Sequence, residues 1–280
     1  MKTVLVTGAA RGIGRSIAIE LGRCGYKVAV NGLHAGSIKQ VVEDIRRAGG
    51  SAEGFCANVA DPAAVTAMMD EVSSKMGALD IVIHNAGILH DRKCEFMTDR
   101  EWQSVLAVHL NGAFYCIQRA LAHLNRHGGD ILLMTSTAGL AGSAGQVNYS
   151  AAKAGLLGMV WTLADELKSR RIRVNGVAPA ALTDMTRPVV QHLTDKYAQR
   201  NEPLPEAWKL GEAEDVARFV RALLDQPDPE LTGRVFGVNG QQITPWEKPR
   251  PLASVTAAPE DFFEFECWKR RRECEADACF

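Results

Sequence analysis

Tyr149 and Lys153 stand four residues apart near the middle of the chain, in the stretch NYSAAK. Residues at this spacing share one face of a helix, so the phenol and the ammonium can point into one site. A free tyrosine has a pKa of about 10 and is a poor base at neutral pH, whereas a neighbouring cation favours its phenolate form. The pair is therefore suited to proton transfer, and we predict that Lys153 lowers the pKa of Tyr149.

A glycine-rich turn, TGAARGIG, lies near the start of the chain and places Gly8, Gly12 and Gly14 between an apolar run and a segment of helical period. Glycines allow a tight turn and a close approach of the backbone to a pyrophosphate, whose charge is met by the N-terminus of the following helix. A turn that needs glycines only for packing is the alternative. Because the triplet follows a first strand, the pattern favours a dinucleotide ligand.

The second apolar run, KVAVN, is followed by Gly32 at the position where NAD-binding folds of this kind place an acid for the ribose hydroxyls. A glycine removes the repulsion against a 2′-phosphate, and Arg11 in the glycine-rich turn can supply a positive charge. The sequence therefore predicts NADP as the cofactor. NAD is the alternative, because no basic residue stands at Leu33.

The elements that would position these residues are short apolar runs, which alternate with longer segments of helical period. Continuous rather than alternating apolar strands, separated by helices, are typical of a parallel sheet that is covered on both faces. We therefore expect an α/β fold of Rossmann type, a doubly wound parallel sheet of about seven strands with helices on both faces. The expected strands lie at 3–7, 27–31, 52–59, 79–85, 130–137, 172–179 and 233–240.

Residues at the ends of the expected helices agree with this pattern. Asp61 followed by Pro62 is typical of a helix start, and Gly25 and Gly49 fall just after helical segments, where a left-handed residue is favoured. After Gly240 the periodicity weakens. We predict one dinucleotide-binding oxidoreductase domain over residues 1–240 and a C-terminal extension over 241–280, partly disordered or at a subunit interface.

Composition limits the classes of partner. The chain has 280 residues and a formal net charge of -1, which provides no overall field for attracting nucleic acid or an anionic membrane surface. The N-terminal residues do not follow the order of a secretory signal, and no apolar run approaches the roughly 20 residues of a membrane span. We expect a cytoplasmic protein. The cysteines of the extension lack the paired spacing of a zinc site, so no metal is predicted.

Several motifs, in this order, resemble those of the short-chain dehydrogenase/reductase family: TGAARGIG, HNAG at 84–87, HLNGAF at 109–114, a serine in MTSTAG, YSAAK and VNGVAPAALTDM. The resemblance runs from Met1 to about Gly240. Within the family it is strongest to the 3-oxoacyl-acyl carrier protein reductases and to the (3R)-hydroxyacyl-CoA dehydrogenase domains. The second group carries an acid where this chain has Gly32, which disfavours NAD and the oxidative direction.

The resemblance implies four catalytic roles. Tyr149 would donate the proton to the carbonyl oxygen in reduction, and Lys153 would lower its pKa and hold the nicotinamide ribose. Ser136, thirteen residues before the tyrosine, would hydrogen-bond the substrate oxygen. Asn111 in HLNG would hold a water in the proton relay to Lys153. Taken singly, each of these residues could equally be structural; their joint occurrence with the glycine-rich turn favours catalysis.

The same resemblance implies a set of cofactor contacts. Two positions depart from the family pattern: Asn58 stands where aspartate is usual, and Ala180 follows Pro179 where glycine is commoner. The asparagine keeps an acceptor and the alanine adds one methyl, so both are compatible with binding. The predicted contacts are Gly8, Arg11, Gly12, Ile13, Gly14, Asn58, Val59, Asn85, Ala86, Gly87, Tyr149, Lys153, Pro179 and Thr183.

Together these features predict an NAD(P)H-dependent reduction of a ketone to a secondary alcohol, with a 3-oxoacyl thioester on coenzyme A or acyl carrier protein as the substrate. The alternatives are an NAD-linked dehydrogenase of another secondary alcohol, cyclic or steroid-like, and a cofactor-binding scaffold without catalysis. The loop over 185–210 is expected to cover the substrate. The resemblance also implies a homotetramer or a homodimer.

Overall fold

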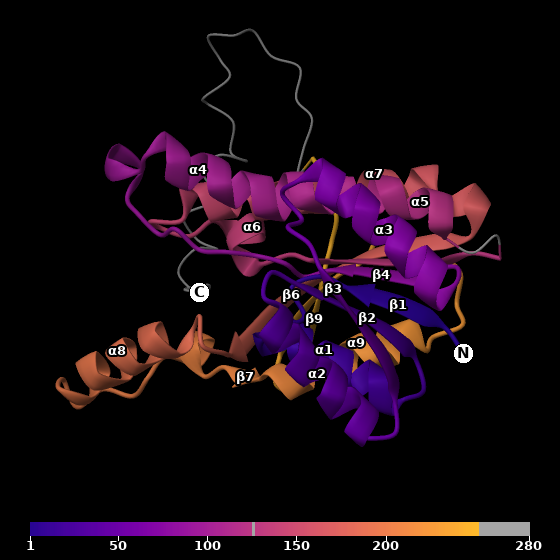
Figure 1. Cartoon of the computed structure of the whole chain (residues 1–280). Helices are drawn as coiled ribbons and strands as arrows, with labels where there is room; N and C mark the ends of the chain where they lie inside the picture. The colour runs from indigo at the N-terminus through magenta and orange to yellow at the C-terminus, as the bar shows by residue number, and fades with distance from the viewer. Residues whose placement is uncertain (125–126, 252–280) are drawn as a thin grey trace, which may run out of the picture.

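A computed structural model describes residues 1–124 and 127–251 and shows a central sheet between two layers of helices (Figure 1). The strands are β1 (Thr3–Val6), β2 (Lys27–Gly32), β3 (Ser51–Cys56), β4 (Ile81–His84), β5 (Gly129–Met134), β6 (Ile172–Leu182), β7 (Gly211–Glu212), β8 (Val235–Asn239) and β9 (Gln242–Trp246). The α-helices are α1 (Gly12–Arg23), α2 (Ala35–Arg47), α3 (Pro62–Met76), α4 (Asp99–Leu106), α5 (Gly112–His123), α6 (Thr137–Ala141), α7 (Val147–Glu166), α8 (Arg187–Ala198) and α9 (Ala213–Leu224).

The sheet confirms the predicted doubly wound topology. Its strand order is β3-β2-β1-β4-β5-β6-β8-β9, with β7 paired to β6, and every pairing is parallel except that of β8 with β9. The seven strands from β3 to β8 on this path are the seven expected. After β3 the chain crosses to the other side of β1, and open α/β sheets bind their ligands at the carboxyl ends of the strands beside such a crossover.

Two apolar cores lie on opposite faces of the sheet. Successive side chains of a strand point to opposite faces, and accordingly Leu5 belongs to the core under α3, α5 and α7, whereas Val4 and Val6 belong to the core under α1, α2 and α9. Figure 1 shows these two helix groups above and below the sheet. Burial on both faces explains why the inner strands, such as β1 and β4, are largely apolar.

The predicted helix ends are also confirmed. The carboxylate of Asp61 accepts hydrogen bonds from the backbone N–H groups of Ala63 and Ala64, and Pro62 occupies the first helical position of α3. Gly25 and Gly49 both have a φ of 84°, in the left-handed region that glycine tolerates best. None of the helices in the described ranges is long and apolar enough to span a membrane.

The sheet continues past the domain boundary predicted after Gly240. β9 pairs antiparallel with β8 from Gln242 to Trp246, so the first residues of the predicted extension belong to the sheet. Residues 252–280, with Cys267, Cys274 and Cys279, lie outside the described residues. The segment expected to cover the substrate contains α8, which has no buried residue and projects away from the sheet in Figure 1.

Candidate active site

The glycine-rich turn joins β1 to α1 and is shaped by backbone conformations that side chains disfavour. Gly8 and Gly12 have φ values of 61° and 55°. A Cβ atom on Gly14 would lie 2.5 Å from the carbonyl oxygen of Gly8, so a side chain there would force the turn open. Helix α1 begins at Gly12 without a side-chain cap and with no acidic residue in its first turn. Its N–H groups are therefore suited to an anion.

The turn after β4 braces the glycine-rich turn from the side. The amide nitrogen of Asn85 donates to the carbonyl oxygens of Thr7 and Gly8, both at 3.1 Å. In return the Thr7 hydroxyl accepts the backbone N–H groups of Asn85 and Ala86 at 3.0 and 3.1 Å. The structure therefore places Asn85 and Ala86, predicted as cofactor contacts, against the glycine-rich turn. Their hydrogen bonds to Thr7 and Gly8 hold that turn in place.

At the end of β2, Asn31 is a residue that the sequence interpretation missed. It is buried, and its amide nitrogen donates to the carbonyl oxygens of Phe55 and Ala57 at 3.2 and 3.1 Å. The neighbouring Gly32 packs closely, because a Cβ atom there would lie 3.1 Å from the Cβ of Ala10. A buried polar residue at the end of an otherwise apolar strand was the available signal.

The remaining predicted cofactor residues surround the same edge of the sheet. Asn58 is exposed and its side-chain oxygen accepts the N–H of Ala60 at 3.0 Å, whereas Val59 is buried. Thr183 follows β6, and its methyl carbon lies 3.8 Å from where a Cβ of Gly12 would stand. Arg11 is the exposed N-cap residue of α1, Ile13 packs against the core under α1, and Pro179 pairs in register with Val238 of β8.

Tyr149 and Ser136 meet at the carboxyl ends of the strands. Ser136 follows β5 as the N-cap residue of α6, and its hydroxyl accepts the N–H of Ala138 at 3.1 Å. Tyr149 lies in the first turn of α7, within hydrogen-bonding reach of the Ser136 side chain. The structure thus brings together two residues that are thirteen positions apart in the sequence.

Lys153 lies one turn after Tyr149 on the buried face of α7. Only 4% of it is exposed, its Nζ donates to the carbonyl oxygen of Met134 at 2.5 Å, and Nζ lies 5.4 Å from the centroid of the Tyr149 ring. Burial lowers the pKa of Lys153 to about 7. The tyrosine, serine and lysine therefore form one cluster; the spacing predicted that the tyrosine and the lysine lie together, and the family resemblance added the serine.

The predicted lowering of the pKa of Tyr149 is not found in this structure. Burial raises the pKa of Tyr149 above its ordinary value of 10.0, and the negative charge of Asp91 adds to the rise, while the hydrogen bond with Ser136 opposes it. The reason is that removal from water disfavours the phenolate, and Lys153, itself buried, is a weakened cation. In this state the phenol is held protonated, as a proton donor must be.

The HLNG segment forms a widened turn of π-helix over Ala107–Asn111, between α4 and α5. Asn111, predicted to hold a relay water, is exposed, and its role stays a prediction. The residue of this turn that contacts the catalytic cluster is His109, which is buried with its ring edge-on to the Tyr149 ring, the centroids 5.2 Å apart. The sequence interpretation missed His109, although it lies four residues after buried Val105 and four before buried Ala113.

Comparison with known proteins identifies the family of this chain. The family model described as short chain dehydrogenase matches residues 2–194. The chain belongs to the short-chain dehydrogenase family.

Relatives within the short-chain dehydrogenase family support the same grouping. A 3-oxoacyl-[acyl-carrier-protein] reductase FabG of Staphylococcus aureus is 41% identical over 244 residues, which cover 85% of this chain and 97% of the relative. A 3-oxoacyl-[acyl-carrier-protein] reductase of Synechocystis is 37% identical over 246 residues, with 86% and 97% covered. A short chain dehydrogenase from Mycobacterium avium has a similar structure, with a TM-score of 0.77 at 30% identity, over 93% of this chain and 91% of that one.

Membership in the short-chain dehydrogenase family implies a nicotinamide cofactor, and the residues present fit one. The close approach at Gly14 and the left-handed Gly8 and Gly12 leave backbone rather than side chains at the start of α1, where a pyrophosphate would lie. Along the same edge of the sheet, Lys153 and Tyr149 offer a buried amine and a hydroxyl, which would hold the nicotinamide ribose. When bound, the cofactor supplies the hydride.

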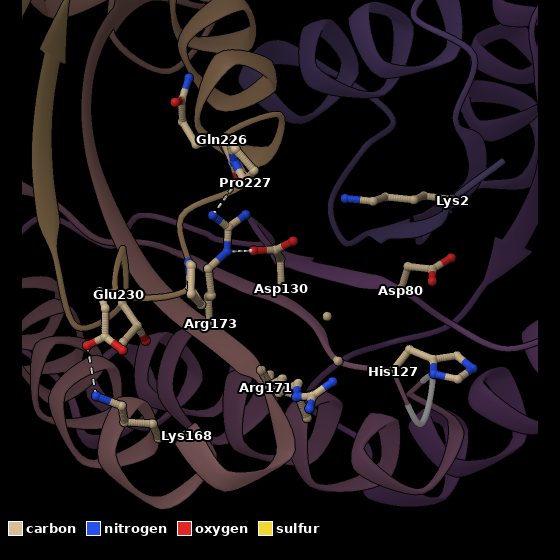
Figure 2. Close-up of a pocket in the computed structure, with 15 residues that line it drawn as sticks. Lys2, Asp80, His127, Asp130, Lys168, Arg171, Arg173, Gln226, Pro227 and Glu230 are labelled. Carbon is tan, nitrogen blue, oxygen red and sulfur yellow. Dashed lines mark hydrogen bonds and ion pairs between the residues drawn. The ribbon is translucent and has the colours of Figure 1, made fainter.

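A cavity of about 540 Å³ lies at the opposite, amino-terminal edge of the sheet (Figure 2). Its charged lining includes Asp130 at the start of β5 and Arg173 at the start of β6, whose carboxylate and guanidinium are 2.7 Å apart. None of the predicted catalytic residues lines it. The two edges of the sheet therefore carry different groups, and Ser136, Tyr149 and Lys153 lie at the carboxyl edge.

Proposed function

We propose that this short-chain dehydrogenase reduces a 3-oxoacyl thioester to the 3-hydroxyacyl thioester with NADPH. A hydride goes to the C3 carbonyl carbon, and Tyr149 gives its phenolic proton to the oxygen, so that a secondary alcohol forms. The observation that carries the proposal is the cluster of Ser136, Tyr149 and Lys153 at the carboxyl edge of the sheet, in which Lys153 is buried and the other two side chains are partly buried. The relatives named as 3-oxoacyl-[acyl-carrier-protein] reductases supply the class of substrate.

Each residue of the cluster has a different role in the proposed reaction. The raised pKa of Tyr149 keeps its proton in place at neutral pH until charge develops on the substrate oxygen. The Ser136 hydroxyl, already directed at the phenol, can donate to the same oxygen. Lys153 supplies the positive charge that stabilises the phenolate left after proton transfer, because charge attraction grows when the partner becomes an anion.

Two features support NADPH over NADH. The end of β2 carries Gly32 and the exposed Leu33, neither of which repels a 2′-phosphate. Arg11 is exposed at the N-cap of α1, beside the same edge, and makes no side-chain cap to the helix. A guanidinium at this place can bind the phosphate through paired N–H groups.

The test is the loss of nicotinamide absorbance with acetoacetyl-CoA and with acetoacetyl-acyl carrier protein, each with NADPH and with NADH. We expect turnover that is faster with NADPH and that falls by a factor of at least about 10² in Tyr149→Phe, since the proton donor is removed. Cofactor binding without turnover of either thioester would contradict the substrate class. Faster turnover with NADH would contradict the assignment of NADP.

A further inference from the structure

Two buried histidines lie beside the catalytic cluster, and the proposed reaction uses neither of them. His84 ends β4 and is 1% exposed, and His109 lies in the widened turn and is 2% exposed. Burial, followed by the nearby charge of Lys153, lowers the pKa of His84 to about 3 and the pKa of His109 well below its ordinary value. Both rings are therefore neutral at physiological pH, which leaves Lys153 as the cation of this group.

The hydrogen bonds of Thr7 determine which nitrogen of His84 carries the proton. The Thr7 hydroxyl accepts the N–H groups of Asn85 and Ala86, which occupies both of its acceptor positions. Its single proton is then left for the Nδ1 of His84, 3.3 Å away. Nδ1 must accept this bond, so the neutral ring carries its proton on Nε2.

The protonated Nε2 of His84 faces the widened turn. In that turn the N–H of Gly112 donates to the carbonyl oxygen of Ala107, five residues back, and not to that of Val108, as it would in an α-helix. The carbonyl oxygens of Val108 and His109 lie close enough to the His84 ring to favour its N–H form, although none of the described residues meets full hydrogen-bond geometry with Nε2. His84 thus bonds to Thr7 on one side and lies against the widened turn that carries His109 on the other.

His109 continues the link to the catalytic phenol. Its Nε2 lies 3.1 Å from the backbone nitrogen and 2.8 Å from the carbonyl oxygen of Ile88, which fixes the plane of the ring. One edge of the ring then meets Tyr149 at an interplanar angle of 89°. A Cβ on Gly87 would lie 2.4 Å from the Cε1 of His109, so the glycine leaves the space that the ring fills.

We propose that His84 and His109 are a pair of positioning residues that couple the glycine-rich turn to Tyr149. His84 positions the widened turn beside Thr7, and His109 packs at right angles to the phenol and shields that side of it from water. The coupling gives a reason for a histidine, rather than an apolar residue, at each position: both rings form polar contacts with backbone or hydroxyl groups and still pack against apolar surface. That the phenol so positioned is a proton donor rests on the proposed function.

The first test needs no substrate. We expect the pKa of Tyr149, measured by the phenolate absorbance that disappears in Tyr149→Phe, to fall in His109→Asn, since a smaller side chain admits water and weakens the effect of burial. The other groups that face this site are unchanged in the variant. Ser136 and Asp91 act on the pKa of Tyr149, and Lys153 and His84 act on that of His109. His123→Asn is the matched control. His123 is the partly exposed last residue of α5, and it pairs with Asp70 of α3. An unchanged pKa in His109→Asn would overturn the proposal.

The second test reads the tautomer of His84. Nitrogen NMR of the protein with labelled histidine, with the signal assigned through His84→Asn, should show a proton on Nε2 and no titration between about pH 5 and 9. A proton on Nδ1, or titration in this range, would contradict the link to Thr7. This result stands whether or not the protein reduces a thioester.

The third test is kinetic and separates positioning from binding. In His109→Asn we expect kcat for the reduction to fall by about tenfold or more, because small displacements of a catalytic group are costly, with the Kd for NADPH within about twofold of the wild type. A change in Kd with unchanged kcat would overturn the proposal. Absence of turnover in the wild type would contradict the proposed function alone, since the phenol and tautomer measurements remain.

Discussion

At the scale of single residues, Lys153 carries a charge that folding has removed from water. The pKa of Lys153 is lowered from 10.5 to about 7, so between these values the unfolded chain binds more protons than the folded one. The free energy of unfolding therefore rises with pH in this window. Below it, where the buried amine is charged in both states, the full cost of burial applies.

A comparison with Lys153→Met isolates this contribution. Between about pH 7.5 and 9 we expect the free energy of unfolding of the wild type to increase, relative to that of the variant, by up to about 1.4 kcal/mol per pH unit. Urea unfolding of both proteins at about pH 7.5 and 9 measures this change in the free energy of unfolding. In Lys168→Met, where the exposed ammonium pairs with Glu230, no such divergence is expected. Parallel pH profiles of wild type and Lys153→Met would contradict the lowered pKa.

Arg11 provides the residue-scale test of cofactor choice. If its guanidinium binds the 2′-phosphate, Arg11→Ala should raise the KM for NADPH by about tenfold, equivalent to about 1.4 kcal/mol, and should change the KM for NADH little. Arg23→Ala, at the exposed far end of the same helix, is the control. Equal effects on both cofactors would place Arg11 away from the phosphate.

At the scale of elements, the position of Ser136 depends on the contact between α6 and α7. Gly139 of α6 lies against the backbone of α7, and a Cβ there would stand 2.6 Å from the carbonyl carbon of Lys153. Backbone atoms cannot give way as a flexible side chain does. A side chain at Gly139 must therefore separate the two helices, and with them Ser136 from Tyr149.

Gly139→Ala should lower kcat for the reduction by about tenfold or more through this displacement. Gly158→Ala is the matched control, because a Cβ on Gly158 of α7 would meet no atom of the described residues within 4 Å. That control should keep full activity and gain up to about 1 kcal/mol in stability, since alanine favours a helix. Specific activity and urea unfolding distinguish the two; equal activity would refute the contact.

The widened turn also shows why spacing placed Tyr149 beside Lys153, whereas the HLNG motif did not indicate that His109 faces inward. Tyr149 and Lys153 lie in a regular helix, where residues four apart share a face. The π-helical turn lies in the segment that carries His109 and Asn111, and its extra residue shifts every later position around the helix axis. A motif match gives the order of residues along the chain, but it does not report which of two polar residues in such a turn faces inward.

At the scale of the whole molecule, the amino-terminal and carboxyl-terminal ends of the strands have different roles. The former carry an ion pair that stabilises the fold, and the latter carry the candidate active site. Arg173 at the amino edge binds Asp130 and also donates to the carbonyl oxygens of Gln226 and Asp228, which follow α9 (Figure 2). Both side chains of this ion pair are about nine-tenths buried, and burial raises the pKa of Asp130 despite the guanidinium. Arg173 thus connects β5, β6 and the segment after α9, which are distant from one another in the sequence.

Arg173→Met should therefore destabilise the protein by about 3–5 kcal/mol, because it leaves Asp130 buried without a partner. The second substitution Asp130→Asn should recover part of this loss. Urea unfolding measures both, and the specific activity of the folded variants at low temperature should match the wild type, since no catalytic candidate lines this edge. A loss below about 1 kcal/mol, typical of exposed pairs, would show that the pair is not effectively buried.

The overall architecture followed from the sequence because apolar runs buried on both faces leave little choice of sheet. Of the seven parallel strands, the inner ones have this character, whereas β3 at the side of the sheet is partly exposed. β7 was missed because it has two residues, and β9 because QITPW contains a proline and is almost entirely exposed. β9 belongs to the sheet because it pairs with β8, and the residues of β9 alone do not indicate that pairing.

β9 has a consequence for how molecules of this protein meet one another. Without it, the apolar strand β8 would end the sheet with a row of unpaired N–H and C=O groups, a template onto which a strand of another chain could add. β9 occupies that row, and Pro245 within it has no N–H to offer in turn. A short, proline-bearing strand is thus the outer strand on this side of the sheet in the described residues, and it is a poorer template for another chain than β8 would be.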